Sequence, residues 1–108
     1  MRRMPKLSLP QGMTEEVAAI IEVLGNHVRT EILRRLAQQP MTAVDLAAEL
    51  DVAHSSVWRH LVLLEERGLV TADADPGRRR GNKHVVWATV PDRVREMGTQ
   101  WIAYASGD

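Results

Sequence analysis

The chain has 108 residues, which is enough for one domain with a single core and too few for two. It contains no cysteine, so a disulfide framework, a thiolate metal site and a cysteine nucleophile are all excluded. The 14 Lys and Arg balance the 14 Asp and Glu, so a strongly basic total, the simplest indication of a nucleic-acid partner, is missing.

Residues 1–13 combine three cations with two prolines and a glycine, a composition that disfavours regular structure. We expect a flexible basic arm over 1–13 and one folded domain over 14–108. The arm lacks the apolar segment of a secretory signal, and no apolar run elsewhere reaches the length of a membrane span. The expected location is therefore the cytoplasm.

Two helices are predicted after the arm. Thr14 can cap the first, whose apolar positions recur at helical spacing as Val17, Ile20, Ile21 and Leu24 before Gly25 ends it. Asn26 can cap the second, over residues 27–39, which places Val28, Ile32, Leu33 and Leu36 on its inner side before Pro40.

A short helix and a longer one follow in close succession. In "TAVDLAAEL", Thr42 and Asp45 resemble a capping box, and Val44, Ala47 and Leu50 are expected to be buried. Only "DVA" separates this helix from the next, which is expected over Ala53–Arg67 with Val57, Leu61 and Leu64 inward. Such a brief connection makes two helices cross steeply.

The apolar period then changes from 3.6 to 2. "LVTAD" and "HVVWATV" are β-branched and alternating, and "ADPGRRRGN" between them predicts a hairpin with a long basic tip. Pro91 can begin a final helix whose apolar stripe contains Val94, Met97, Trp101 and Ile102.

Two steeply crossed helices followed by a basic hairpin predict a winged helix-turn-helix, a mostly α fold with a small β-hairpin wing (α+β). In this fold the second helix of the pair enters the DNA major groove. Its first turns and the wing, together with the start of the preceding helix, are then the DNA-binding surface. The expected DNA-binding residues are Thr42, His54, Ser55, Ser56, Trp58, Arg59, Arg78, Arg79, Arg80 and Lys83.

These side chains have roles in DNA recognition. Ser55 and Ser56 are short donors near a positive helix N-terminus, and Arg59 can make a bidentate contact to guanine. Four cations within residues 78–84 favour contact with phosphates. For Trp58, contact with DNA and packing on the protein are equally open.

From Leu24 to Val90 the sequence resembles the arsenic-repressor (ArsR) group of bacterial winged-helix regulators. The resemblance is carried by "LGNHVRTEILRRL", "MTAVDLAAELDVAHSSVWRHLVLLEERGLV" and "HVVWATV". It implies a homodimer, a recognition helix that binds an inverted-repeat operator, and a repressor role. The sequence departs from the family at three positions. Asp51 stands where such turns usually have glycine, and Trp58 replaces a small polar residue. Ala53 replaces a polar cap, so Ser55 or Asp51 is left to satisfy the first N–H groups of the helix.

Enzymatic and metal-binding functions are not expected. No nucleophile with a base and an orienting acid appears, nor does a Gly-rich phosphate loop. The four histidines lie in four different elements without ligand spacing, so we expect no metal site and no cofactor. His60 is expected to be a structural histidine bonded to the backbone.

The first and last helices are predicted to form a homodimer interface. Together their stripes would expose a larger apolar patch than monomeric proteins usually tolerate. The expected dimerisation residues are Val17, Ile20, Ile21, Leu24, Val94, Met97, Trp101 and Ile102. The alternative is that the two helices cover each other within one chain. Alternatives to a repressor are an origin-binding or excision factor of a mobile element and a winged-helix protein-interaction module.

Overall fold

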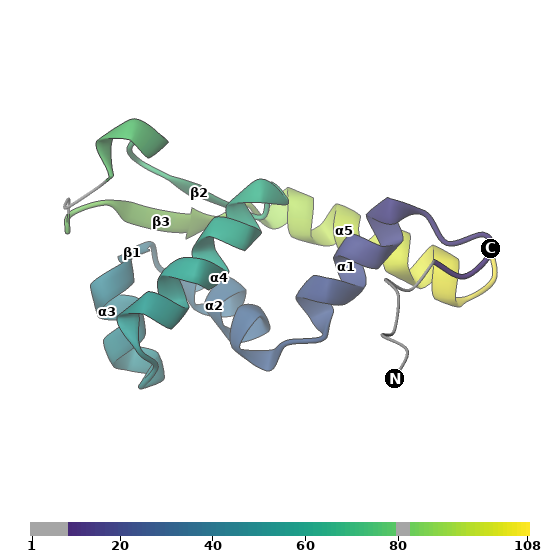
Figure 1. Ribbon diagram of the computed structural model, residues 1–108, viewed down its shortest axis with the longest axis horizontal. Coiled ribbons are helices and arrows are strands. Elements are labelled where there is room, and N and C mark those ends of the chain that lie inside the picture. Colours follow the sequence, from purple (N-terminus) through teal and green to yellow (C-terminus); the bar gives the residue numbers. More distant parts are fainter. Residues whose placement is uncertain (1–8, 80–82) are drawn as a thin grey trace, which may run out of the picture.

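The computed structural model describes residues 9–79 and 83–108. Within these ranges the order of elements is α1 (Glu15–Leu24), α2 (His27–Gln38), β1 (Met41–Thr42), α3 (Ala43–Leu50), α4 (His54–Glu66), β2 (Val70–Ala72), the 3-10 turn η1 (Pro76–Arg78), β3 (Val86–Thr89) and α5 (Pro91–Ala105). Figure 1 shows α1 and α5 side by side at one end of the molecule. The hairpin and α3 lie at the other end, with α2 and α4 between.

The predicted helix starts are confirmed by their hydrogen bonds. The side-chain oxygen of Thr14 accepts from Val17 N–H at 3.1 Å, and that of Asn26 accepts from Val28 N–H at 2.9 Å. The hydroxyl oxygen of Thr42 accepts from Asp45 N–H at 3.1 Å. Each bond satisfies a backbone donor that the first turn of a helix leaves without a partner.

The connection between α3 and α4 depends on one left-handed residue. Asp51 has φ 54° and ψ 48°, a conformation that Asp tolerates better than most residues because its short side chain can bond locally. This turn lets α4 start after only three intervening residues. The sequence predicted that Ser55 or Asp51 would cap α4. This prediction is wrong, because α4 begins after Ala53 with no side-chain cap hydrogen bond.

A single core joins the helices to the sheet. Val57, Leu61 and Leu64 are completely buried on one side of α4, as predicted, and Trp87 of β3 is equally buried. In α3 the buried residues are Ala43, Leu46 and Ala47, while Leu50 is only partly buried. The expectation for Val44 is wrong, because its side chain is 46% exposed.

The sheet has one strand that the sequence did not predict. Its order is β1-β3-β2 and both pairings are antiparallel, with Met41 opposite Trp87 and Val70 opposite Thr89. The predicted hairpin is present with shorter strands, and β1 adds a third strand directly before α3. The hydroxyl of Thr89 donates to the carbonyl of Leu33 at 2.7 Å, which ties the sheet to α2.

The apolar stripes of α1 and α5 are divided between the inside and the surface. Val17, Ile20 and Met97 are buried and Val94 is partly buried, since α1 and α5 pack against each other within the chain. To this extent the two helices do cover each other. The remaining large side chains are exposed: Ile21 41%, Leu24 45%, Trp101 39% and Ile102 58%.

The predicted arm over 1–13 lies outside the described residues up to residue 8. Residues 9–13 include a turn in which Met13 N–H donates to the carbonyl of Pro10 at 3.0 Å. Among the described helices, none is long and apolar enough to cross a membrane.

Candidate nucleic-acid interface

The first turns of α4 present polar side chains to the surface. His54, Ser55 and Arg59 are exposed, and Ser56 is half-buried. They are held there by the opposite side of α4, where Val57 and Leu61 are completely buried. The polar face of α4 is therefore available for contact with a groove of DNA.

Trp58 packs on the protein, one of the two alternatives that the sequence left open. Its ring meets Trp87 edge to face, with centroids 5.7 Å apart and planes at 88°. This is a favourable arrangement for two aromatic rings, because the positive edge of one faces the negative face of the other. Trp58 remains partly exposed, so it also forms part of the surface of α4.

The basic wing is divided by the structure. Arg78 and Lys83 are exposed, whereas Arg79 is buried, with only 9% of its surface exposed. Arg80 lies outside the described residues. Two of the four predicted wing cations therefore stand at the surface in the described part of the chain.

The expected phosphate contact of Arg79 is not supported by its position. Its guanidinium donates to both carboxylate oxygens of Glu65 and to the carbonyl of Ala74, all at 2.7 Å, and lies 4.9 Å from the ring centre of Trp87. The hydrogen bonds from Arg79 to Glu65 hold the pKa of the guanidinium above its ordinary value. All of these contacts point inward, so Arg79 attaches the wing to α4.

His60 has the structural role that was expected, but with a different partner. Arg29 Nε donates to His60 Nδ1 at 3.2 Å, joining α2 to α4 through side chains and not through the backbone. Burial lowers the pKa of His60, and the charges of Arg29 and Arg59 lower it further. The lowered pKa favours the neutral imidazole, whose Nδ1 accepts the hydrogen bond from Arg29.

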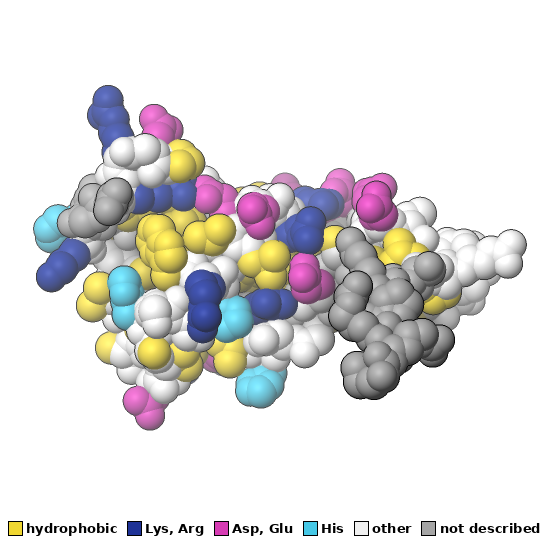
Figure 2. All heavy atoms as spheres, viewed as in Figure 1, with side chains coloured by type: hydrophobic (Ala, Val, Ile, Leu, Met, Phe, Trp, Pro, Cys, Tyr) yellow, Lys and Arg dark blue, Asp and Glu magenta, His cyan; other side chains and the backbone are white. Residues whose placement is uncertain are grey.

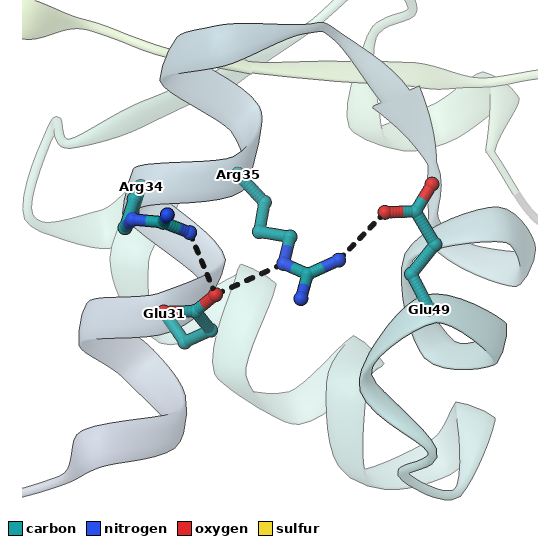
Figure 3. A network of polar contacts seen from close by, with 4 residues as sticks. All are labelled: Glu31, Arg34, Arg35 and Glu49. Carbon is teal, nitrogen blue, oxygen red and sulfur yellow. Dashed lines mark hydrogen bonds and ion pairs between the residues drawn. The ribbon is translucent and has the colours of Figure 1, made fainter.

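A surface ion-pair network connects α2 to α3 (Figure 3). Glu31 accepts from Arg35 at 2.9 Å and from Arg34 at 3.1 Å, and Arg35 also donates to Glu49 at 2.7 Å. The hydrogen bond from Arg35 lowers the pKa of Glu31. Exposed pairs add little stability, so this network is a surface link between α2 and α3 and adds little to the core that holds them.

Thr42 is half-buried and its oxygen caps α3, so its position beside the expected DNA surface has a structural explanation. Among the described residues, no group of three His, Asp or Glu side chains could hold a metal ion.

Comparison with known proteins agrees with this geometry. Residues 24–72 match the family model described as a helix-turn-helix domain. An uncharacterised HTH-type transcriptional regulator of Methanocaldococcus jannaschii is 38% identical over 58 residues, which are 54% of this chain. The chain spans 61% of the length of that relative.

Solved structures show the same architecture over most of the chain. An ArsR-like transcriptional regulator from Rhodococcus sp. RHA1 has a TM-score of 0.68 at 23% identity, with 85% of this chain and 79% of that chain covered. The chain therefore has a winged helix-turn-helix fold like that of this regulator. NolR of Sinorhizobium fredii gives a TM-score of 0.62 at 21% identity, covering 83% of this chain and 85% of that one. The predicted ArsR-type resemblance and α+β fold class are confirmed.

In this fold, α3 and α4 form the helix-turn-helix pair, and β2 and β3 form the wing. The residues that the sequence missed are apolar ones, Val44 on α3 and Val85 before β3, which lie beside α4 and the wing. The hydrophobic periodicity of the sequence does not indicate this position, because it predicts Val44 to be in the core and Val85 to be an ordinary strand residue.

Proposed function

We propose that the chain is a sequence-specific, double-stranded DNA-binding transcriptional regulator that acts as a homodimeric repressor. The observation that carries this proposal is the placement of the exposed side chains of α4. His54, Ser55 and Arg59 project from a helix whose other side is fully buried, and Arg78 and Lys83 are exposed on the adjacent wing.

Each part of this surface has a distinct role in DNA binding. Arg59, on the second turn of α4, would contact base edges in the major groove, where a bidentate bond to guanine gives about 1–3 kcal/mol of discrimination. Arg78 and Lys83 would contact phosphates, which raises affinity for all sequences. Ser55 lies in the first turn of α4, where free backbone N–H groups favour an anion.

The exposed apolar residues of α1 and α5 support the homodimer. Ile21 and Leu24 on α1, with Trp101 and Ile102 on α5, remain exposed after the two helices have packed together. These helices lie at the end of the molecule opposite α3 (Figure 1). A two-fold axis at this end would bury the four side chains and leave both recognition helices free, one helical turn of DNA apart.

Selection of bound duplexes from a random pool tests the DNA-binding proposal. We expect an inverted repeat, because a two-fold symmetric dimer reads two identical half-sites. A pool that shows no enriched sequence at moderate salt would contradict sequence-specific binding.

Sedimentation tests the dimer. The chain should sediment at twice its mass of 12.1 kDa, and Trp101→Glu should shift it to the monomer and weaken operator binding. Val62→Glu is the matched control for sedimentation alone, since Val62 is similarly exposed at 38% but lies on α4, away from α1 and α5, and this variant should remain a dimer. A wild-type mass near 12.1 kDa at micromolar concentration would refute the dimer.

A further inference from the structure

An open cleft of 690 Å³ lies between the wing, the start of α3 and the first turns of α4. Figure 2 shows apolar side chains gathered between the wing and α4, with Lys, Arg and His side chains around them. The lining residues are Ala43, Val44, His54, Ser55, Trp58, Arg59, Pro76, Arg79, Lys83, Val85 and Trp87. The volume is within the range of about 300–1,000 Å³ that is typical of small-molecule sites.

The walls of the cleft are apolar and aromatic. The aromatic surface comes from Trp58, which is partly exposed. Its ring is held edge to face against the completely buried Trp87, with the ring centroids 5.7 Å apart. Val44, at 46% exposure, supplies a further apolar surface from α3. A rigid aromatic wall of this kind favours a flat apolar ligand, because rings pack on rings with little loss of conformational entropy.

Charge around the cleft has one sign. Among the described residues that line it, Arg59 and Lys83 are cations and none is Asp or Glu. Within residues 9–79 and 83–108, neither cation takes part in an ion pair, whereas the charge of Arg79 is matched by Glu65. His54 and Ser55 add hydrogen-bonding groups at the positive end of α4. The cleft is therefore complementary to an anion.

Duplex DNA alone does not account for these walls. Interfaces with DNA are more polar and more positively charged than other protein interfaces, but Trp58 and Val44 present apolar surface in this cleft, above the buried side chains of Trp87 and Val85. The apolar surface is thus available to a smaller molecule that places its charged group among the cations.

We propose that the cleft binds a small aromatic carboxylate, and that this ligand releases the protein from DNA. The regulatory half of the inference rests on the proposed DNA-binding function. The aromatic body packs against Trp58 and Val44, and the carboxylate pairs with Arg59 or Lys83. Because Arg59 is also a proposed base-contacting residue, ligand and operator compete for the same side chain.

Nuclear magnetic resonance gives a direct test without DNA, using 2-naphthoate as the probe. The chain has three tryptophans, so its indole N–H groups give three signals. We expect 2-naphthoate to shift the signals of Trp58 and Trp87 and to leave that of Trp101, on α5, in place. Equal shifts of all three signals, or none, would overturn the site.

Matched ligands test the chemistry of the site. Naphthalene-2-carboxamide has the same rings without the charge, so it should bind about tenfold more weakly, the loss of one charge-assisted hydrogen bond. Decanoate keeps the charge without the rings and should also bind more weakly. If the carboxamide or decanoate binds as tightly as 2-naphthoate, the assignment of an aromatic anion is wrong.

Val44→Glu tests the location of the site. A carboxylate at this exposed position should weaken 2-naphthoate binding at least about tenfold, and its place in the first turn of α3 is compatible with the helix dipole. Val62→Glu, on α4 but outside the cleft, should bind as the wild type does. Unchanged binding by Val44→Glu would place the ligand elsewhere.

Competition with the selected operator then separates the two proposals. If 2-naphthoate shifts the indole signals and raises the protein concentration needed to bind operator, both stand. If no duplex is bound but the signals still shift, the proposed function fails while the ligand site stands. If operator is bound and 2-naphthoate neither shifts the signals nor competes, the inference fails alone.

Discussion

Replacement of Arg79 by alanine should destabilise the fold far more than it weakens contact with DNA. The guanidinium makes three hydrogen bonds of 2.7 Å, two of them to Glu65, and stacks on Trp87. Removing one partner of a buried ion pair costs about 3–5 kcal/mol. The side chain of Glu65 is 30% exposed, so water can solvate the released carboxylate and reduce this cost.

The expected loss follows from these two effects. Partial solvation of Glu65 lowers the ion-pair cost, while the lost contact with Trp87 adds about 0.5–1 kcal/mol. We therefore expect Arg79→Ala to lower the free energy of unfolding by about 2–4 kcal/mol. Arg78→Ala is the matched control and should change it by less than about 0.5 kcal/mol, because Arg78 is exposed.

Urea unfolding followed by circular dichroism measures both variants. The chain concentration must be held constant, because association of folded chains adds to apparent stability. A double-mutant cycle with Glu65→Ala isolates the interaction between Arg79 and Glu65. The double variant should lose less free energy of unfolding than the two single variants lose in sum. If Arg79→Ala unfolds like Arg78→Ala and yet loses DNA affinity, the guanidinium faces DNA and our assignment is wrong.

Three further predictions concern α4 and the wing. Arg59→Ala should lose discrimination between operator variants more than general affinity, and titrations that rank the variants as the wild type does would contradict this. Arg78→Ala and Lys83→Ala together should reduce the slope of log affinity against log salt by about 0.9 per lost phosphate contact, whereas an unchanged slope would mean that the wing does not touch DNA. The folded state lowers the pKa of His60, so His60 binds a proton more readily in the unfolded chain. The free energy of unfolding should therefore fall as the pH drops below about 6.5, the ordinary pKa of histidine, and level off below the pKa of the folded state. His60→Gln should abolish this part of the pH dependence, and an identical stability profile would refute it.

The helices could be predicted from the sequence because their boundaries depend on neighbouring residues. Thr14 and Asn26 bond to backbone groups two or three residues away, and the left-handed turn at Asp51 needs only a residue that tolerates it. Pro91 likewise begins α5 as expected. The polar face of α4 followed from the same local periodicity.

The features that were missed depend on distant partners. Strand β1 has only two residues and exists because β3 lies beside it. The sequence gives no reason to distinguish one of three consecutive arginines from the next. Arg79 differs from Arg78 because it reaches Glu65 on α4, fourteen residues earlier in the chain. In the eight-residue helix α3, apolar residues occur on several sides, so periodicity did not show that Leu46 is buried and Val44 exposed.

The short strand β1 also affects how the chain behaves in concentrated solution. An unpaired strand edge can recruit a second chain and begin aggregation. Here the longest strand, β3, is central, and the outer strands β1 and β2 have only two and three residues. Just beyond β2, Asp73 accepts a hydrogen bond from Val86 N–H at 2.8 Å, which occupies a backbone donor that another strand could otherwise pair with. The wing sheet is therefore a poor template for edge-to-edge pairing, so association should proceed through helices and not through strands.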